Sequence, residues 1–269
     1  MLVVIGGTGL NQLPGFSVAR EELVVTPYQA APVAILCGTL ADCKTEIAFL
    51  PRHGARHSVP PHIINYRANI FALRELGTTA VLAVNAVGGI NKNMGPGVIA
   101  VPRQIIDYTY GRAHTFFDGQ VIALESADKL SASVTHIDFT EPYDAGLRAL
   151  LVRSAAEQNI AVWPDGVYGA TQGPRLETPA EIKRLQRDGC DMVGMTGMPE
   201  AALAREAGLP YACMAISVNW GAGLTDDVIT MDGIRQILSQ GMGNIRAVLL
   251  QAAKLYSKAA ESAGSGGGV

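Results

Sequence analysis

Arginine and histidine side chains gather in one short segment, Arg52-His53-Gly54-Ala55-Arg56-His57, that follows the apolar run 46–50. Arginine presents a planar fork of donors that matches phosphate, and a neighbouring histidine can also donate and changes its charge near pH 7. A turn of solvated basic residues is the alternative. Because loops positioned by a rigid sheet often carry function, the segment predicts a site for a small oxyanion.

Two glycine loops follow other apolar runs. The first, Gly6-Gly7-Thr8-Gly9, could turn backbone amides and the Thr8 hydroxyl toward an anion. It lacks the last glycine of a dinucleotide fingerprint and the Gly-Lys-Ser/Thr of a P-loop, so a tight structural turn stays open as an alternative. In the second loop, 85–90, a turn explains the glycines but leaves Asn85 without a role.

A third candidate loop is 194–200, in which Thr196 stands just before a helix whose first position is Pro199. Free amides and the positive end of the helix dipole favour an anion there. We assign Met198 to the core and place Met195 nearer the ligand. Several separate loops thus offer donors to one anion, and this repetition is stronger evidence than any single loop.

Two further polar side chains follow strand-like runs. Glu177 lies in 173–178 just before a helix, and Asn219 lies in 217–221 at a strand end. Taken alone, Glu177 resembles an ordinary first-turn carboxylate and Asn219 an ordinary turn residue.

The elements that must position these loops alternate between short runs rich in Val and Ile and longer segments of helical period. This pattern is typical of an α/β protein, and it predicts a single domain with a central, mixed but mostly parallel sheet flanked by helices. Strands are expected at 2–5, 33–36, 46–50, 80–84, 98–101, 166–170, 192–194 and 212–218, and helices at 64–76, 145–158, 179–187, 199–207 and 232–258.

The clearest helix start is at Thr178, which can cap the helix, with Pro179 in its first position and Glu181 completing a capping box. One domain is expected over 1–260, and the glycine-rich segment 261–269 is expected to be a disordered tail.

Composition excludes several classes of protein. A net charge of −3 over 269 residues gives no overall attraction to nucleic acid or to an anionic membrane. No apolar run reaches the roughly 20 residues that span a bilayer. The four cysteines form no Cys-x-x-Cys pair and no metal-ligand spacing, so we expect no metal, reduced thiols and a cytoplasmic location.

Taken together, the loops resemble the trimeric purine nucleoside phosphorylase and methylthioadenosine phosphorylase family. The similarity runs from Val3 to about Val248 and rests on five motifs in order: IGGTG at 5–9, RHG at 52–54, NAVGGI at 85–90, QGPRLET at 172–178 and GMTGMPEAALARE at 194–206. Over 171–231 the chain looks most like the bacterial S-methyl-5′-thioinosine phosphorylases.

The resemblance implies a homotrimer with active sites near subunit contacts, into which segment 108–118 could reach from a neighbour. It also implies roles for individual residues. Asn219 and His53 would be catalytic. Phosphate would be held by Thr8, Arg52, His53, Asn85, the backbone amide of Ala86, and Thr196. Nucleoside would contact Met195, Asn219, Trp220 and Gly221, with Glu177 and Met231 influencing substrate choice.

The chemistry of the purine follows from Glu177 and Asn219. A 6-oxopurine has a donor at N1, which an ionised Glu177 can accept, whereas adenine presents a lone pair there. A buried mismatch of this kind costs about 1–3 kcal/mol. The adenosine-type relatives carry acidic residues where this chain has Asn219 and Gly221. Hypoxanthine or guanine is therefore expected over adenine.

For the sugar, the segment Val228-Ile229-Thr230-Met231 and Ile234 place apolar side chains where hydroxyl-preferring relatives have a histidine. This favours a 5′-methylthio group, so the expected reaction converts S-methyl-5′-thioinosine and phosphate into hypoxanthine and 5-methylthioribose 1-phosphate, without a cofactor. The alternatives are a general 6-oxopurine nucleoside phosphorylase, a methylthioadenosine phosphorylase, a nucleosidase that uses water, and a purine-binding protein without activity.

Overall fold

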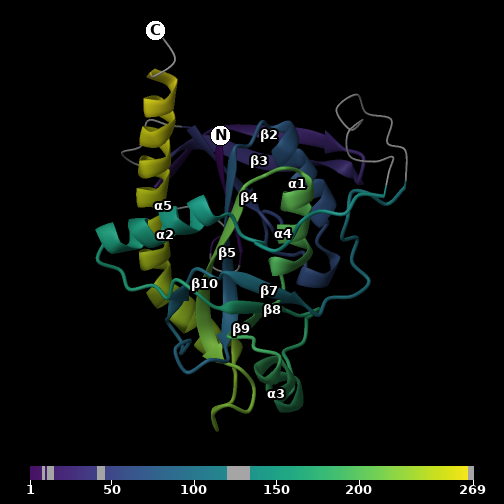
Figure 1. Cartoon of the computed structure of the whole chain (residues 1–269), viewed down its shortest axis with the longest axis vertical. Helices are drawn as coiled ribbons and strands as arrows, with labels where there is room; N and C mark the ends of the chain where they lie inside the picture. Colours follow the sequence, from purple (N-terminus) through teal and green to yellow (C-terminus); the bar gives the residue numbers. More distant parts are fainter. Residues whose placement is uncertain (8–9, 11–14, 41–45, 120–133, 266–269) are drawn as a thin grey trace.

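A ten-stranded mixed sheet forms the centre of the molecule, and α-helices cover both of its faces (Figure 1). The computed structural model describes residues 1–7, 10, 15–40, 46–119 and 134–265. The strands are β1 (Leu2–Gly6), β2 (Phe16–Thr26), β3 (Gln29–Leu40), β4 (Glu46–Pro51), β5 (Ala80–Gly89), β6 (Ile99–Ala100), β7 (Gln104–Asp107), β8 (Val167–Ala170), β9 (Met192–Gly194) and β10 (Tyr211–Trp220). The helices are α1 (Tyr66–Glu75), α2 (Ala145–Glu157), α3 (Pro179–Arg187), α4 (Gly197–Glu206) and α5 (Met231–Ser265), with a short 3₁₀ turn, η1, at Pro61–Ile63.

The side chains of strand β1 are buried on both faces of the sheet. Leu2 and Val4 pack into the core under α2 and α5, whereas Val3 and Ile5 pack into the core under α1 and α4. A strand that is buried on both faces reads as a continuous apolar run. The result is the expected layered α/β architecture, with a helix pair on each side of the sheet (Figure 1).

The capping box predicted at Thr178 is confirmed. The Thr178 hydroxyl accepts from the Glu181 amide at 3.2 Å, the Glu181 carboxylate accepts from the Thr178 amide at 2.8 Å, and α3 spans the predicted residues. In α4, Met198 has an extended backbone (φ −119°, ψ 142°), so the regular helix begins at Pro199 as expected.

Two strands, β2 and β7, were not predicted from the sequence. β2 carries Arg20, Glu21 and Glu22 and lies at the edge of the sheet, where most of its side chains are exposed and no apolar pattern arises. β7 has only four residues. At the other end of the chain, the prediction of a disordered tail from Glu261 was wrong for 261–265, which continue α5; residues 266–269 lie outside the described part.

The arrangement around β5 creates a gap in the sheet. On one edge of β5, β1 pairs in parallel as far as Ala83, and β9 pairs antiparallel at Gly88 and Gly89. The carboxyl ends of β1 and β9 therefore approach each other from opposite directions. Between them, residues 84–87 of β5 pair with neither strand on this edge, so their backbone groups are available to side chains and ligands.

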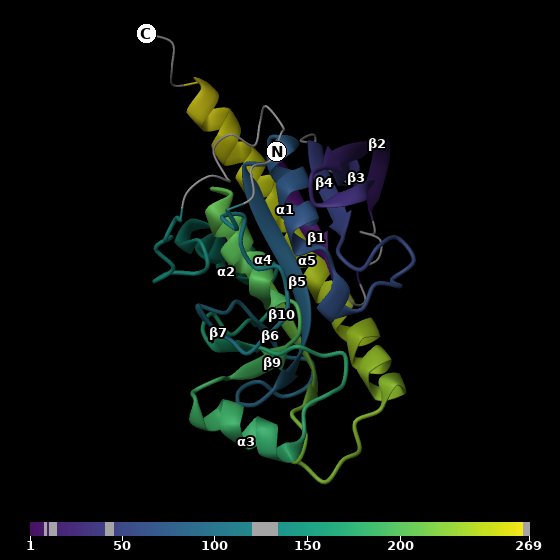
Figure 2. The same ribbon diagram turned by 90° about the vertical axis from the view of Figure 1, so that its right-hand side faces the viewer.

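The segment 221–230 and α3 lie together at the end of the molecule opposite the C-terminus (Figure 2). Helix α5 starts at this end and runs the length of the sheet (Figures 1 and 2). No helix in the described part of the chain is long and apolar enough to cross a membrane.

Candidate active site

A cavity of about 530 Å³ opens at the gap beside β5. It is lined by residues at or just beyond the ends of β1, β4, β9 and β10 and by residues at the start of α5. The predicted residues that line it are Arg52, His53, Ala86, Glu177, Met195, Thr196, Asn219 and Met231. Segments that are far apart in the sequence thus converge on one site, which is the usual position for ligands in α/β folds.

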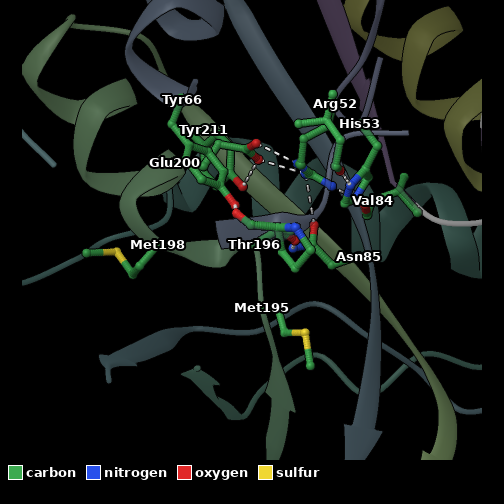
Figure 3. Close-up of polar contacts among 12 residues, drawn as sticks. Arg52, His53, Tyr66, Val84, Asn85, Met195, Thr196, Met198, Glu200 and Tyr211 are labelled. Carbon is green, nitrogen blue, oxygen red and sulfur yellow. Dashed lines mark hydrogen bonds and ion pairs between the residues drawn. The ribbon is translucent and has the colours of Figure 1, made fainter. Parts of the chain in front are cut away.

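Arg52 forms a buried ion pair with Glu200 (Figure 3). Its Nε donates to Glu200 Oε2 at 2.6 Å and its Nη2 to Glu200 Oε1 at 2.7 Å. Nη1 also donates to the carbonyl of Val84 at 3.1 Å, within the gap of β5. The side chains of Arg52 and Glu200 are 0% and 2% exposed, so this is a bidentate pair shielded from water.

The environment keeps Arg52 charged. Burial alone would lower the pKa of the guanidinium, but the charge and hydrogen bonds of Glu200 outweigh burial and raise it above its usual range. A Cβ atom at Gly7, directly after β1, would stand 2.6 Å from the carbonyl oxygen of Val84 and 2.8 Å from Arg52 Nη1, so a glycine is required at this position. Most of the donors of Arg52 are therefore used within the protein, which the sequence did not indicate.

Asn85 connects Arg52 with Thr196 (Figure 3). Its Oδ1 accepts from Arg52 Nη2 at 3.3 Å, and its Nδ2 donates to the Thr196 hydroxyl at 2.9 Å. Asn85 is 1% exposed and is not part of the cavity lining, so it supports the site from behind. Since the Thr196 oxygen accepts from Asn85, its own proton is free for a ligand.

His53 lines the cavity and is fixed by a backbone carbonyl. Its Nδ1 lies 2.8 Å from the carbonyl oxygen of Val59, and its ring centroid lies 4.5 Å from that of His57. Burial lowers the pKa of His53 to about 4, and the positive charge of Arg52 also lowers this pKa. The ring is consequently neutral near pH 7.

Glu177 and Asn219 both reach the cavity. The hydroxyl of Thr171 donates to Glu177 Oε1 at 2.6 Å, which leaves Oε2 as the carboxylate oxygen for a ligand. The side-chain amide of Asn219 donates to the carbonyl of Trp220 at 2.7 Å and has a second proton to give.

The apolar wall predicted at 228–234 is smaller than expected. Met231 and Ile234 line the cavity, with Met231 57% exposed. Val228 and Ile229 instead line a separate hollow, and Val228 is 83% exposed.

Two predicted nucleoside ligands lie outside the cavity lining, and a third predicted ligand, which belongs to the phosphate site, is not described. Thr8 lies outside the described residues. Trp220 lines the separate hollow, and a Cβ atom at Gly95 would stand 3.1 Å from its ring. Gly221 donates its amide to the carbonyl of Gly89 at 2.7 Å. Trp220 and Gly221 therefore belong to the support of Asn219 rather than to the lining of the cavity.

Arg112 was not singled out from the sequence, although its segment 108–118 was. It is buried and ties together the two loops that flank the cavity. Its guanidinium donates to the carbonyls of Met195 and Met198 on one loop and of Thr171 and Gln172 on the other, at 2.6–3.2 Å. This part of the segment thus serves the site of its own chain.

The signals for Glu200 and Arg112 were weak in the sequence. Glu200 stands in a motif that was recognised, but nothing in the motif indicated a role for its carboxylate, and its partner Arg52 is 148 positions away. Arg112 binds mainly backbone carbonyls, which every residue has, so residue types do not reveal its partners. A buried arginine needs acceptors, yet only the fold shows which groups supply them.

Replacing Arg112 with Met is expected to lower the free energy of unfolding by at least about 3 kcal/mol, because several buried carbonyls lose their donor. Urea unfolding followed by circular dichroism measures this change. Arg175→Met is the matched control, since Arg175 is an exposed arginine paired with Glu181, and its effect on the free energy of unfolding is expected to be much smaller. Equal effects of the two substitutions would contradict the role of Arg112.

The chain belongs to the phosphorylase superfamily, whose family model matches residues 2–254. It is similar to a probable S-methyl-5′-thioinosine phosphorylase from Pseudomonas syringae pv. tomato, with 54% identity over 246 residues, covering 91% of this chain and 95% of that protein. It is also similar to the 6-oxopurine nucleoside phosphorylase from Pyrococcus furiosus, with 42% identity over 257 residues, covering 96% of this chain and 93% of that protein.

Among solved structures, the methylthioadenosine phosphorylase from Schistosoma mansoni in complex with adenine superimposes with a TM-score of 0.87 at 30% identity, covering 96% of this chain and 92% of that chain. The family and the nucleoside phosphorylase fold expected from the motifs are confirmed.

Proposed function

We propose that the protein is a purine nucleoside phosphorylase that cleaves S-methyl-5′-thioinosine with inorganic phosphate, giving hypoxanthine and 5-methylthioribose 1-phosphate. One observation carries the proposal: a single cavity combines anion donors, the carboxylate of Glu177 and the apolar side chains of Met231 and Ile234. The name of the Pseudomonas syringae relative supports the same substrate.

Phosphate would bind at the gap of β5, where Thr196 offers a hydroxyl proton and Ala86 offers its backbone amide. Arg52 supplies positive charge beside this position and is itself held by Glu200. A preorganised, partly dry site strengthens these interactions because no water must be rearranged during the reaction. Thr8 is proposed as a further ligand from its place in the glycine loop.

The purine would bind with its N1 proton donated to Glu177 and with O6 or N7 accepting from Asn219. Phosphate attacks C1′ as the purine departs, and the sugar passes through an oxocarbenium-like state. The anion stabilises the cationic sugar, while the hydrogen bond from Asn219 stabilises the electron-rich leaving group. The reaction needs no covalent intermediate on the protein and no cofactor.

The sugar is selected less sharply than the purine. A hydrophobic pocket discriminates a group of methylthio size by roughly 10- to 200-fold. Met231 is more than half exposed, so inosine is expected to be a slower substrate rather than an excluded one. A general 6-oxopurine phosphorylase, the activity in the name of the Pyrococcus furiosus relative, is the second candidate.

The test is a panel of methylthioinosine, inosine, guanosine, methylthioadenosine and adenosine, each with and without phosphate. The proposal requires release of base that depends on phosphate and is fastest with methylthioinosine. Cleavage independent of phosphate would indicate a nucleosidase, and binding without turnover would indicate a purine sensor. Fastest turnover of inosine would favour the second candidate.

Changing Asn219 to Asp is expected to shift the preference toward 6-aminopurines, because a carboxylate accepts from the amino group of adenine. The structure adds a cost: the amide now donates to the carbonyl of Trp220, and a carboxylate oxygen would face that carbonyl. We therefore expect lower kcat/KM for hypoxanthine nucleosides together with a smaller hypoxanthine-to-adenine ratio. Steady-state kinetics with both nucleosides measure the ratio, and an unchanged ratio would exclude this role for Asn219.

The same proposal includes a homotrimer in the cytoplasm. Sedimentation velocity of the purified protein tests for the trimer. A protein that sediments as a monomer or dimer would exclude it.

A further inference from the structure

The imidazole of His53 has a defined tautomer. Nδ1 lies 2.8 Å from the carbonyl oxygen of Val59. Because a carbonyl oxygen can only accept, Nδ1 carries the ring proton and donates it there. His53 lines the cavity, so the nitrogen that remains for a ligand is Nε2.

Nε2 is an acceptor near neutral pH. Burial lowers the pKa of His53 to about 4, with further lowering by Arg52 and a smaller lowering by His57, and the hydrogen bond to Val59 does not offset these effects. Arg52 and His57 are the charged and titratable groups that act on the ring. Because the pKa lies below neutrality, Nε2 presents a lone pair above about pH 4.

The other groups proposed to hold the anion are donors. Arg52 has only N–H groups, Ala86 offers an amide, and the Thr196 oxygen already accepts from Asn85, so its hydroxyl donates outward. A fully deprotonated anion would satisfy all of these donors but would meet the lone pair of Nε2 with a lone pair of its own. An anion that keeps one hydroxyl group satisfies both kinds of partner.

We propose that His53 recognises the proton on the anion, with Nε2 accepting a hydrogen bond from the P–OH group of hydrogen phosphate. The site would then select tetrahedral oxyanions that carry a proton, such as phosphate and arsenate, over sulfate, which carries none near neutral pH. The inference rests on the proposed function, in which phosphate is the co-substrate.

Direct binding of anions to the nucleoside-free protein tests the inference. Phosphate, monofluorophosphate and sulfate are titrated calorimetrically near neutral pH. Monofluorophosphate has the charge and shape of hydrogen phosphate, with fluorine in place of the hydroxyl group. Phosphate is expected to bind roughly 10- to 100-fold more tightly than either other anion, the value of one hydrogen bond to a charged group. Equal affinities would overturn the inference without any variant.

His53→Leu supplies the complementary test, because a leucine side chain neither accepts nor donates, whereas a glutamine amide could still accept from the P–OH group through its oxygen. The preference for phosphate over sulfate is expected to shrink roughly tenfold or more. His136→Leu is the matched control, since His136 is exposed and does not line the cavity, so it is expected to leave the ratio unchanged. A His53→Leu protein that keeps the wild-type ratio would overturn the assignment.

Acidification gives a third readout on the wild-type protein. As the pH falls toward about 4, Nε2 gains a proton and becomes a donor, so sulfate binding should tighten. Sulfate affinity that stays constant with pH contradicts the inference. If turnover depends on phosphate but all three anions bind equally, only the role of His53 is overturned. If phosphate is preferred but no nucleoside is cleaved, the proposed function is overturned instead.

Discussion

Glu200→Gln is expected to lower the free energy of unfolding by about 3–5 kcal/mol, because it leaves the buried charge of Arg52 without its counter-charge. Tyr211 amplifies the effect, since its hydroxyl donates to the same carboxylate at 2.8 Å. In a glutamine, the side-chain NH2 group would face N–H groups of Arg52 or the hydroxyl of Tyr211, which already donate to this position. Denaturant unfolding measures the loss.

The control is Glu157→Gln, which removes a carboxylate from the exposed pair with Arg153 and is expected to lower the free energy of unfolding far less. Activity measurements separate an effect of Glu200→Gln on folding from an effect on phosphate binding. If Arg52 stays in place only through Glu200, the folded fraction of the variant should show a raised KM for phosphate. An unfolding free energy close to that of the wild-type protein would contradict the importance of the pair.

Glu177→Gln is expected to reverse the selection of the purine. The Thr171 hydroxyl donates to Oε1, so in the variant it would hold the amide oxygen and direct the amide nitrogen toward N1 of the base. An amide donor suits the lone pair of adenine and opposes the N1 proton of hypoxanthine. The kcat/KM for hypoxanthine nucleosides should fall roughly 10- to 100-fold, while that for adenine nucleosides should hold or rise.

Steady-state kinetics with methylthioinosine and methylthioadenosine measure this ratio. Thr171→Val removes the hydroxyl that orients the carboxylate and should reduce the selectivity in part, whereas Thr171→Ser retains the hydroxyl and serves as its control. Parallel loss of both activities in Glu177→Gln would show that Glu177 supports the loop rather than reads the base.

Local patterns were sufficient for much of this molecule. Apolar runs marked the buried strands because both faces of the sheet are covered, and Thr178, Pro179 and Glu181 specified the start of α3 through hydrogen bonds within one turn. The polar residues at the strand ends were found in the same way, since a glycine loop after a buried strand is visible in the sequence. β2 could not be found, because an exposed edge strand needs no apolar periodicity.

The sequence by itself therefore determined the α/β class, the family and the loops that supply the site, since each depends on residues close together in the chain. The tertiary structure alone decided how these loops are used. It splits the pairing along β5, turns most donors of Arg52 toward Glu200, Val84 and Asn85, and places Asn85 behind Thr196. It also fixes the tautomer of His53 through Val59. These outcomes depend on burial and on partners far away in the sequence, because a buried charge or lone pair takes its role from the groups that surround it.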